Sequence, residues 1–417
     1  MSLMTGILKT IHDLATKPCV EKNALNSGDD EEEMEDDVSS QSSTEGTRSS
    51  NSGDEEEDDD SSTEYSVLSE NQYMGEEDEE VGDYYLVRYI GSGSFGVVWK
   101  ATRKEDDDAV VAVKISRKDE LSDREVRILS LLGEHPNIVS LYDAFQFDDD
   151  RRFVLVMNLM RSNLFDFMRK FSEKKVPVNV AKSITRQILL ALQHLATHKV
   201  VHTDLKPENI LVDDSDPDNV LAQFADFGSA SSVGDNDICK YGKTVAYRSP
   251  EVLCNAYRCT RPPADTWSIA CVIFELFAGT VLFDPHQSHT YSAKNTGSAS
   301  TSPEMNKQQL SLMVELLGKF PKRFAMANRK YFNRLGHLKD VGEIKQIDLR
   351  AIMVVECEME HALAMDLYDF LMPMLLYTPR LRAKPEVLLQ SRFLSVEEEP
   401  EEEEKDDENN DGESKDL

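Results

Sequence analysis

The sequence lacks any long, uncharged apolar stretch. Its most apolar run, Ile269–Phe277, contains Glu275 and is far shorter than the roughly 20 residues that a membrane-spanning helix requires. Residues 1–17 include lysine, histidine and aspartate, so they do not resemble the apolar core of a secretory signal. We therefore expect neither a membrane protein nor a secreted one.

Cysteine is also scarce. The chain has six cysteines among 417 residues, and no two of them have the Cys-x-x-Cys spacing of a structural zinc site. In a chain of this length such thiols are typical of a reducing compartment. The sequence therefore predicts free thiols and a cytoplasmic or nuclear location. The six are Cys19, Cys239, Cys254, Cys259, Cys271 and Cys357.

Basic residues are few: 46 lysines and arginines stand against 78 acids, for a net charge of −32. Residues 29–80 carry −22 and residues 397–417 carry −11, so the rest of the chain is close to neutral. A field of this sign disfavours direct nucleic-acid binding and favours basic protein partners. Such acidic runs repel themselves and bury little apolar surface, so we expect both tails to be disordered.

These shifts in composition divide the chain into three parts. We expect a disordered acidic region over 1–82, a folded domain over 83–394 and a disordered acidic tail over 395–417. Apolar residues recur at helical spacing within 3–15, which predicts a short amphipathic helix. That helix either docks on the chain's own domain or recognises a partner, for instance as an export signal.

The stretch His202–Asn209 (HTDLKPEN) is the centre of the folded part. Apolar runs on both sides predict a strand, a polar loop and a second strand. The loop holds a carboxylate at Asp204, an ammonium at Lys206 and an amide at Asn209. Phosphoryl transfer needs these groups together: a proton acceptor, a cation for the moving phosphoryl group, and an oxygen ligand for a metal ion. The alternative is a polar hairpin between two buried strands.

A glycine-rich segment precedes this loop by about a hundred residues. Residues 91–98 read GSGSFGVV and are followed by a strand-like segment, Trp99–Ala101, instead of a helix. This order argues against a dinucleotide-binding turn and for a hairpin whose backbone amides approach phosphate oxygens. Lys114 ends the next apolar strand. A lysine in this position either binds phosphate or extends from the strand end into solvent.

Three further segments complete the set of candidates. Leu121–Leu132 has helical periodicity and places Glu125 where it could face Lys114, although surface helices often carry such glutamates. Phe153–Met160 is an apolar strand, either part of a nucleotide pocket or plain core. Asp226-Phe227-Gly228 begins 22 residues after Asp204, a spacing that chance rarely produces.

In order and spacing, these motifs resemble the eukaryotic protein kinases over residues 83–394. The resemblance implies an α+β, two-lobed fold with a small antiparallel-sheet lobe (83–160) and a mainly helical lobe (161–394). It implies that Asp204 is the catalytic base and Lys206 the charge stabiliser. Lys114 would hold the ATP phosphates, with Glu125 as its ion-pair partner.

The same resemblance implies the cofactors and their sites. Asn209 and Asp226 would hold Mg²⁺, and Glu251 would pair with Arg382 at the end of the activation segment. Met157 would stand beside the adenine ring, with the hinge at Asn158–Met160. The implied ATP-binding residues are Ile90, Gly91, Ser92, Gly93, Ser94, Phe95, Gly96, Val97, Val98, Lys114, Met157 and Met160.

The C-terminal half resembles the CMGC group and, within it, the SR-protein kinases, which phosphorylate Arg-Ser repeats. LFDPH at 282–286 and ELLGKFP at 315–321 carry this resemblance, while HTDLKPEN and DFGSA are similar to the LAMMER kinases. Thr280 and Gln308 stand where the SR-protein kinases carry acids that bind arginine, and Glu315 retains one. Tyr241 matches a regulatory tyrosine of the dual-specificity tyrosine-regulated kinases.

We therefore predict a monomeric Ser/Thr protein kinase acting on basic, Arg-Ser-rich proteins. A LAMMER or dual-specificity tyrosine-regulated kinase is the alternative enzyme. A pseudokinase scaffold that presents acidic tails to basic partners is the alternative without activity.

Overall fold

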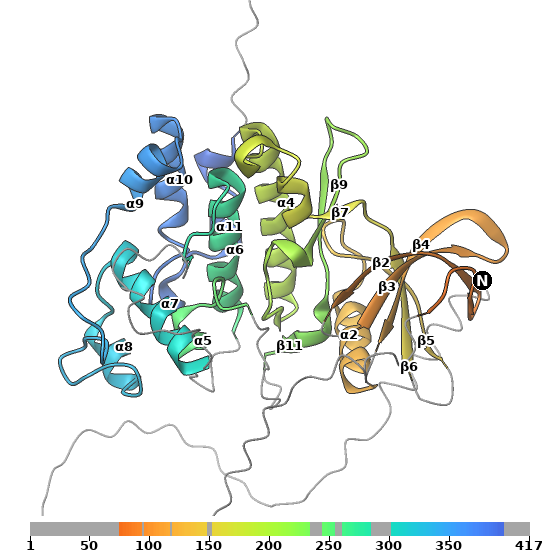
Figure 1. Ribbon diagram of the computed structural model, residues 1–417, viewed down its shortest axis with the longest axis horizontal. Helices are drawn as coiled ribbons and strands as arrows, with labels where there is room; N and C mark the ends of the chain where they lie inside the picture. Colours follow the sequence, from red (N-terminus) through yellow and green to blue (C-terminus); the bar gives the residue numbers. More distant parts are fainter. Residues whose placement is uncertain are drawn as a thin grey trace, which may run out of the picture.

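The computed structural model describes residues 75–93, 96–116, 119–147, 152–233, 244–254, 261–284 and 302–395. Two lobes lie along the long axis of the molecule, a sheet-rich one and a helical one (Figure 1). The predicted helix at 3–15, Ser94, Phe95, Tyr241 and the acidic tails before 75 and after 395 lie outside the described residues. Residues 75–82, which the sequence analysis assigned to the disordered region, belong to the fold, because Glu80–Val81 pairs with the next strand.

The smaller lobe is a curled six-stranded sheet in which every neighbouring pair is antiparallel. Its strand order is β1-β2-β3-β4-β6-β5. Alternating apolar residues form its inner face, with Leu86, Trp99 and Val113 buried. The strands are β1 Glu80–Val81, β2 Tyr84–Gly93, β3 Gly96–Arg103, β4 Asp106–Ser116, β5 Leu141–Phe147 and β6 Arg152–Asn158.

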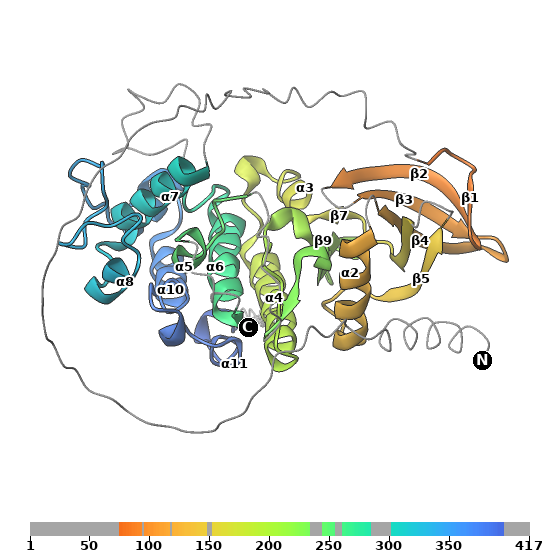
Figure 2. The same cartoon turned by 90° about the horizontal axis from the view of Figure 1, so that it is seen from below.

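One helix, α2 Asp119–Leu132, accompanies this sheet and faces the helical lobe (Figure 2). Val126, Leu129 and Leu132 recur on one face and are buried. They belong to a continuous apolar cluster that extends into the larger lobe. Helix α2 therefore packs against both lobes.

The larger lobe is built around the long helices α4 and α6. The predicted apolar face of α4, from Ile184 to Leu195, is buried, and α6 is apolar nearly all round, as a central helix should be. The described helices are α3 Leu164–Met168, α4 Val178–Thr197, α5 Pro250–Leu253, α6 Pro262–Ala278, α7 Ser302–Leu317, α8 Lys322–Ala327, α9 Leu349–Ala351, α10 His361–Leu371 and α11 Pro385–Leu388.

Two small sheets lie where the lobes meet. One has the order β10-β9-β7 and the other pairs β11 with β8. The segment His202–Asn209 lies between β8 and β9, as the sequence predicted. The strands are β7 Ser162–Asn163, β8 Val200–Val201, β9 Ile210–Asp213, β10 Leu221–Phe224 and β11 Ser231–Ser232.

Single-turn and π-helical segments complete the backbone. They are η1 Ser172–Lys174, η2 Pro207–Asn209, η3 Phe227–Ser229, η5 Ile352–Glu356, η6 Pro379–Leu381 and η7 Arg392–Leu394. Segment η2 forms the end of the loop His202–Asn209, and η3 begins directly after Asp226.

The predicted fold class is confirmed, with one adjustment in the connection between the lobes. Strand β6 ends at Asn158, earlier than the predicted strand, which extended to Met160. The Asn158 side chain accepts from Ser140 N (2.8 Å) and donates to Gln223 Oε1 (2.8 Å), so it fastens the chain to both lobes where the strand stops.

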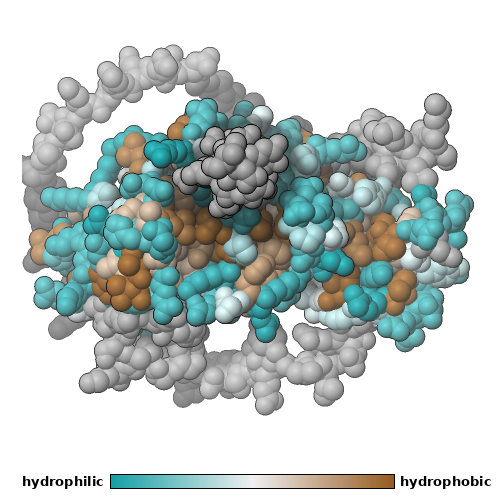
Figure 3. Space-filling view, turned by 90° about the horizontal axis from the view of Figure 1, so that it is seen from above, coloured by the Kyte–Doolittle hydropathy of each residue, from teal (hydrophilic) through white to brown (hydrophobic). Residues whose placement is uncertain are grey.

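The described surface is mainly polar. On the face in Figure 3, hydrophilic residues predominate and hydrophobic ones form separate groups. None of the helices in the described ranges has both the length and the apolar character needed to cross a bilayer.

Candidate active site

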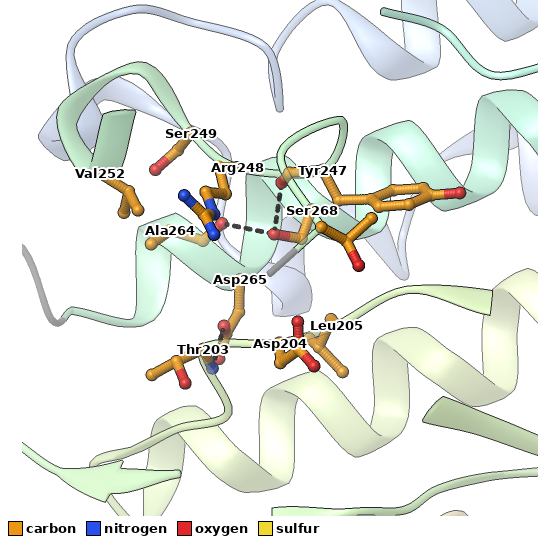
Figure 4. Close-up of a pocket in the computed structure, with 11 residues that line it drawn as sticks. Thr203, Asp204, Leu205, Tyr247, Arg248, Ser249, Val252, Ala264, Asp265 and Ser268 are labelled. Atoms are coloured by element: carbon orange, nitrogen blue, oxygen red, sulfur yellow. Dashed lines mark hydrogen bonds between the residues drawn. The ribbon is translucent and has the colours of Figure 1, made fainter. Parts of the chain in front are cut away.

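A buried carboxylate, Asp265, fixes the backbone of the catalytic-type loop. Its two oxygens accept hydrogen bonds from His202 N (2.7 Å) and Thr203 N (3.0 Å). Thr203 has a φ of +71°, a left-handed conformation that an L-residue adopts only when its surroundings enforce it. Figure 4 shows Asp265 reaching from α6 toward this turn. The conformation of the loop is therefore imposed by a residue more than 60 positions away.

Further bonds complete the support of this turn. Thr203 Oγ1 donates to Ser229 O (3.0 Å), and His202 Nε2 lies 2.9 Å from Ala225 O. Burial raises the pKa of Asp265 to about 6, although the backbone amides and His202 oppose that rise. The loop is thus tied to the Asp226 motif and to α6 at once.

The Asp204 side chain is the centre of the candidate site. Its Oδ2 lies 3.0 Å from Lys206 Nζ and accepts from Asn209 Nδ2 at 3.1 Å. Asn209 Nδ2 also donates to Asp204 O (2.8 Å). The Lys206 ammonium lies 3.4 Å from Thr244 Oγ1, near the end of the activation segment. A carboxylate oriented in this way, with 11% of its side chain exposed, has one edge available to a hydroxyl.

The ion pair predicted between Lys114 and Glu125 is present. Lys114 Nζ lies 2.7 Å from Glu125 Oε2 and 2.8 Å from Asp226 Oδ1. Burial by itself would lower the pKa of Lys114, but the two carboxylates raise it above its usual value. Burial raises the pKa of Glu125, whereas Lys114 overcomes burial at Asp226 and lowers the pKa of that group. Lys114 therefore stays charged, and Asp226 is ionised.

Asp226 and Asn209 are brought together by the backbone. Ala225 N donates to Asn209 O (3.0 Å), and Asp226 has a φ of +63°, which turns its carboxylate toward Lys114. One cation and two carboxylates in the Lys114 cluster leave a net charge of −1. Oxygen ligands with a surplus negative charge suit a hard cation such as Mg²⁺.

The described residues contain no group of three or more His, Cys, Asp or Glu side chains that would hold a metal alone. Mg²⁺ commonly takes only one or two protein ligands and completes its shell with water and substrate phosphates. The donor set of Asn209 and Asp226 fits that pattern.

Several of the expected nucleotide-binding residues lie on neighbouring strands of the sheet lobe. Val98 is the register partner of Lys114, and Met157 pairs with Ala112 and is buried. Gly96 has a φ of +156°, and a Cβ there would lie 2.3 Å from Ile115 O. Only glycine fits so close to that strand. Gly91 has open space beside its Cα, which leaves room for a ligand near the backbone.

Comparison with known proteins agrees with this geometry. Residues 84–394 match the family description "Protein kinase domain". The chain belongs to the protein kinase family.

Relatives of this kinase place it in the CMGC group, as the sequence predicted. It is 29% identical over 380 residues to a "Serine/threonine-protein kinase SRPK" of Physarum polycephalum, covering 75% of this chain and 86% of that protein. It is 30% identical over 349 residues to a "Probable dual specificity protein kinase madd-3" of Caenorhabditis elegans, covering 75% of this chain and 36% of that protein. It is 35% identical over 215 residues to "Mitogen-activated protein kinase 15" of the same organism, covering 48% and 44%. The chain thus spans less than half of these last two relatives.

The kinase has a second buried ion pair below the cleft. Arg382 Nη1 and Nη2 each lie 2.6 Å from an oxygen of Glu251, as predicted. Tyr247 donates to Glu275 Oε2 (2.6 Å), which ties the activation-segment end to α6. Both groups are buried, and burial raises the pKa of each. The segment that contains Tyr247, Arg248 and Ser249, drawn in Figure 4, is therefore held at two points.

Sequence reasoning missed part of an acidic cavity beside α7. Glu315, which was predicted, lines a cavity of about 330 Å³ together with Glu173, Asp284 and Glu356. Thr280 and Lys175 also line it. These acids come from four segments that are far apart in the sequence, so no local motif could have indicated that they line one cavity.

Proposed function

We propose that this kinase transfers the γ-phosphoryl group of ATP to serine or threonine hydroxyls of basic, Arg-Ser-rich proteins. The observation that carries the proposal is the position of Asp204, fixed by Lys206 and Asn209, with one edge of its carboxylate available to a hydroxyl. The first of the relatives described above, a serine/threonine-protein kinase, supports the choice of residue.

In this proposal Asp204 orients the acceptor hydroxyl and takes its proton as the phosphoryl group arrives. The Lys206 ammonium stands 3.0 Å from the same carboxylate and offsets the charge that develops on the transferred group. The Lys114 ammonium, kept charged by its two carboxylate partners, holds the phosphates of the nucleotide. Glu125 orients Lys114 from α2.

Asn209 and Asp226 would hold Mg²⁺, which would neutralise part of the charge of the nucleotide phosphates. The backbone of 91–98 would cover the phosphates, with Ile90 and Val98 against the base and ribose. Met157 and Met160 would border the adenine where β6 ends. In this proposal, polar side chains of the helical lobe carry out the catalysis, and apolar side chains of the sheet lobe contact the nucleotide base.

Charge supports a basic substrate. The cavity beside α7 has four carboxylates, Glu173, Asp284, Glu315 and Glu356, and one ammonium, Lys175. An arginine side chain entering it would exchange hydration for charge-assisted hydrogen bonds. This cavity supplies acids on the folded domain, besides the diffuse field of the tails, and so strengthens the Arg-Ser proposal.

A dual-specificity activity is the second candidate, because the kinase also resembles a "Probable dual specificity protein kinase". Tyr241 is central to this alternative and lies outside the described residues. We favour activity without activation-segment phosphorylation. Thr203 stands in place of the arginine that would bind such a phosphate, and the Thr203 hydroxyl already donates a hydrogen bond to Ser229 O. Stoichiometric phosphate on Tyr241, together with an inactive Tyr241→Phe variant, would support the alternative instead.

A peptide-array assay tests the proposed function. Arrays of Arg-Ser, Ser-Pro, acidic and tyrosine peptides would be phosphorylated by the full chain, with Asp204→Asn as the inactive control. We expect preference for Arg-Ser peptides with phosphate on serine. Equal transfer to tyrosine would favour dual specificity, and no transfer to any peptide would favour a pseudokinase scaffold.

The remaining proposals concern the state of the protein in the cell. Cys271 and Cys357, within the described ranges, are free thiols, which supports a reducing compartment such as the cytoplasm or nucleus. We propose a monomer that binds basic protein partners, with no direct role for nucleic acid or membrane.

A further inference from the structure

Positive charge is concentrated in one exposed part of the helical lobe. Residues 319–345 contain eight lysines and arginines and two acids, a net charge of +6, whereas the chain outside this segment and the acidic tails carries about −5. We call this segment the basic insert surface. Its cations are all exposed: Lys319, Lys322, Arg323, Arg329, Lys330, Arg334, Lys339 and Lys345.

These cations have no anionic partners within the described ranges. None of the eight forms a salt bridge with another described residue, and one of the two acids, Asp340, is paired with Lys307 at 3.0 Å. Like charges held close together repel one another and destabilise a fold unless an anion binds. The arrangement therefore indicates a surface that receives an acidic ligand.

The scaffold beneath the cations is rigid. Phe320 stacks on Phe324 and on Tyr377, with ring centroids 5.1 and 4.0 Å apart, and Phe332 meets Phe320 edge-on at 5.1 Å. Beyond α8 a tight turn closes with a bridge between Phe332 and Leu338. The backbone that carries the cations is consequently fixed before any ligand arrives, which lowers the entropic cost of binding.

The surface is also concave. A cavity of about 520 Å³ opens within it and is lined by Lys319, Asn333 and His337 over an apolar floor that includes Phe332 and Leu338. The charged residues of its lining are Lys319 and Glu343, but the segment that surrounds it carries a net charge of +6, so the potential over this low-dielectric hollow is positive and attracts an acidic chain.

One segment of the same chain matches this surface in charge and reach. Residues 397–417 contain 13 acids and two bases. They follow Ser395, which is fixed to the helical lobe because Phe393 packs on Phe277 and Phe370, with ring centroids 5.4 and 4.7 Å away. A chain of 21 residues reaches about 70 Å when extended, and a domain of this size is about 50 Å across.

The other acidic region is less well placed. Residues 29–80 join the described fold at Gly75, beside Leu86 and Trp99 in the sheet lobe. In both views that sheet and α8 lie at opposite ends of the long axis (Figures 1 and 2). Tethering to the same lobe raises the effective concentration of a segment to the millimolar range when its length suits the span.

We propose that residues 397–417 bind the basic insert surface of the same molecule. The interaction is a set of exposed charge pairs on a rigid, concave platform, so it is reversible and sensitive to salt. While bound, the segment neutralises this surface and keeps its own acids away from the substrate cavity beside α7.

Zero-length carbodiimide cross-linking of the full-length kinase tests the proposal without measuring activity. The reagent joins carboxylates to lysine amines that are already in contact. At low salt we expect links from 397–417 to Lys319, Lys339 and Lys345 to exceed links from the same segment to Lys104, Lys199 and Lys384. In 1 M salt, where the Debye length is about 3 Å, the excess should disappear.

A charge-reversed variant and its matched control make the test specific. Lys322→Glu/Arg323→Glu/Lys330→Glu alters the surface but keeps the three reporting lysines, and Arg88→Glu/Arg169→Glu/Arg380→Glu makes the same charge change elsewhere while keeping the comparison lysines. We expect the links to fall about fivefold or more in the first and to persist in the second, since exposed charge pairs contribute up to ~1 kcal/mol each. Equal melting temperatures would show that both variants are folded.

Three results would overturn the proposal. Links to the reporting lysines from residues 29–80 in place of 397–417 would assign the surface to the other tail. Links spread evenly over all exposed lysines would show no docking. In a mixture of isotopically light and heavy kinase, links that join light to heavy peptides at the random ratio would show binding between molecules.

Discussion

Two buried ionic clusters in this kinase differ in one respect. Arg382 and Glu251 form a neutral pair with side chains 0% and 7% exposed, and Arg382 also donates to the carbonyl oxygens of Leu376 and Pro263. The Lys114 cluster has one cation for two carboxylates, and its Asp226 side chain is 28% exposed. In the Arg382–Glu251 pair the charges balance and both side chains are buried. In the Lys114 cluster the carboxylates outnumber the cation and one of them is partly exposed.

The difference separates a structural role from a functional one. A buried charge whose hydrogen bonds are all made within the protein has nothing left to offer a ligand, and removing its partner mainly affects folding. A cluster with surplus negative charge at the edge of a cleft is stabilised further by a cation. We therefore expect changes at Arg382 to affect stability and changes near Asp226 and Asp204 to affect catalysis.

The largest effect should follow from breaking the complete pair. Arg382→Met leaves the Glu251 carboxylate buried without its cation and should lower the free energy of unfolding by about 3–5 kcal/mol. Urea denaturation measures this. The double variant Glu251→Gln/Arg382→Met should recover part of the loss, because the uncompensated charge is gone. A loss below about 1 kcal/mol for Arg382→Met would contradict the structural role.

A change at the catalytic loop should reduce activity and leave stability unchanged. Asp204→Asn removes the proposed base but little volume, so kcat should fall by about two orders of magnitude or more. The melting temperature and the affinity for a fluorescent nucleotide should stay close to those of the wild type. Asp218→Asn, on an exposed turn, is the matched control. Near-normal turnover of Asp204→Asn would mean that the catalytic loop has been wrongly assigned.

Asp265 lies between the two extremes, because it is buried and also holds the catalytic turn. Burial raises its folded pKa to about 6, whereas an unfolded aspartate titrates near about 3.9. The folded state therefore binds more protons between these values, and the stability from Asp265 falls as pH rises from about 4 through 6. Asp265→Asn should lack this dependence.

Comparing unfolding free energies at pH 5 and pH 7.5 isolates that contribution. The wild-type value minus the Asp265→Asn value should be more favourable to the wild type at pH 5. The other titrating groups cancel in this difference, so a difference that does not change with pH would refute the assignment.

The smallest effect concerns the acidic runs and substrate attraction. Replacing the acids of Asp29–Asp37 and Asp54–Asp60 by their amides should raise KM for Arg-Ser peptides a few-fold at low salt and flatten its salt dependence. We expect kcat to stay unchanged. A lower KM would mean that these runs compete with the substrate, and an unchanged KM at low salt would limit them to solubility or localisation.

The sequence predicted the parts of the site that depend on local order. Asp204, Lys206 and Asn209 lie within six residues, and the Lys114–Glu125 pair joins a strand to the helix that follows it. Spacing fixes such groups because a strand, a tight loop and a strand leave the chain few other paths. The long-range pair of Glu251 and Arg382 was predicted only through the resemblance to protein kinases.

Other features were decided by the tertiary structure alone. Asp265 fixes a left-handed turn more than 60 residues away, and acids from four distant segments line the cavity beside α7. The basic insert surface became visible only when exposure and pairing were known for each cation. Convergence of this kind depends on how distant segments pack against one another, and that packing is set by the whole core. The sequence alone thus determined which chemical groups this kinase uses. The fold decided which charged groups are paired inside the protein and which are exposed to ligands.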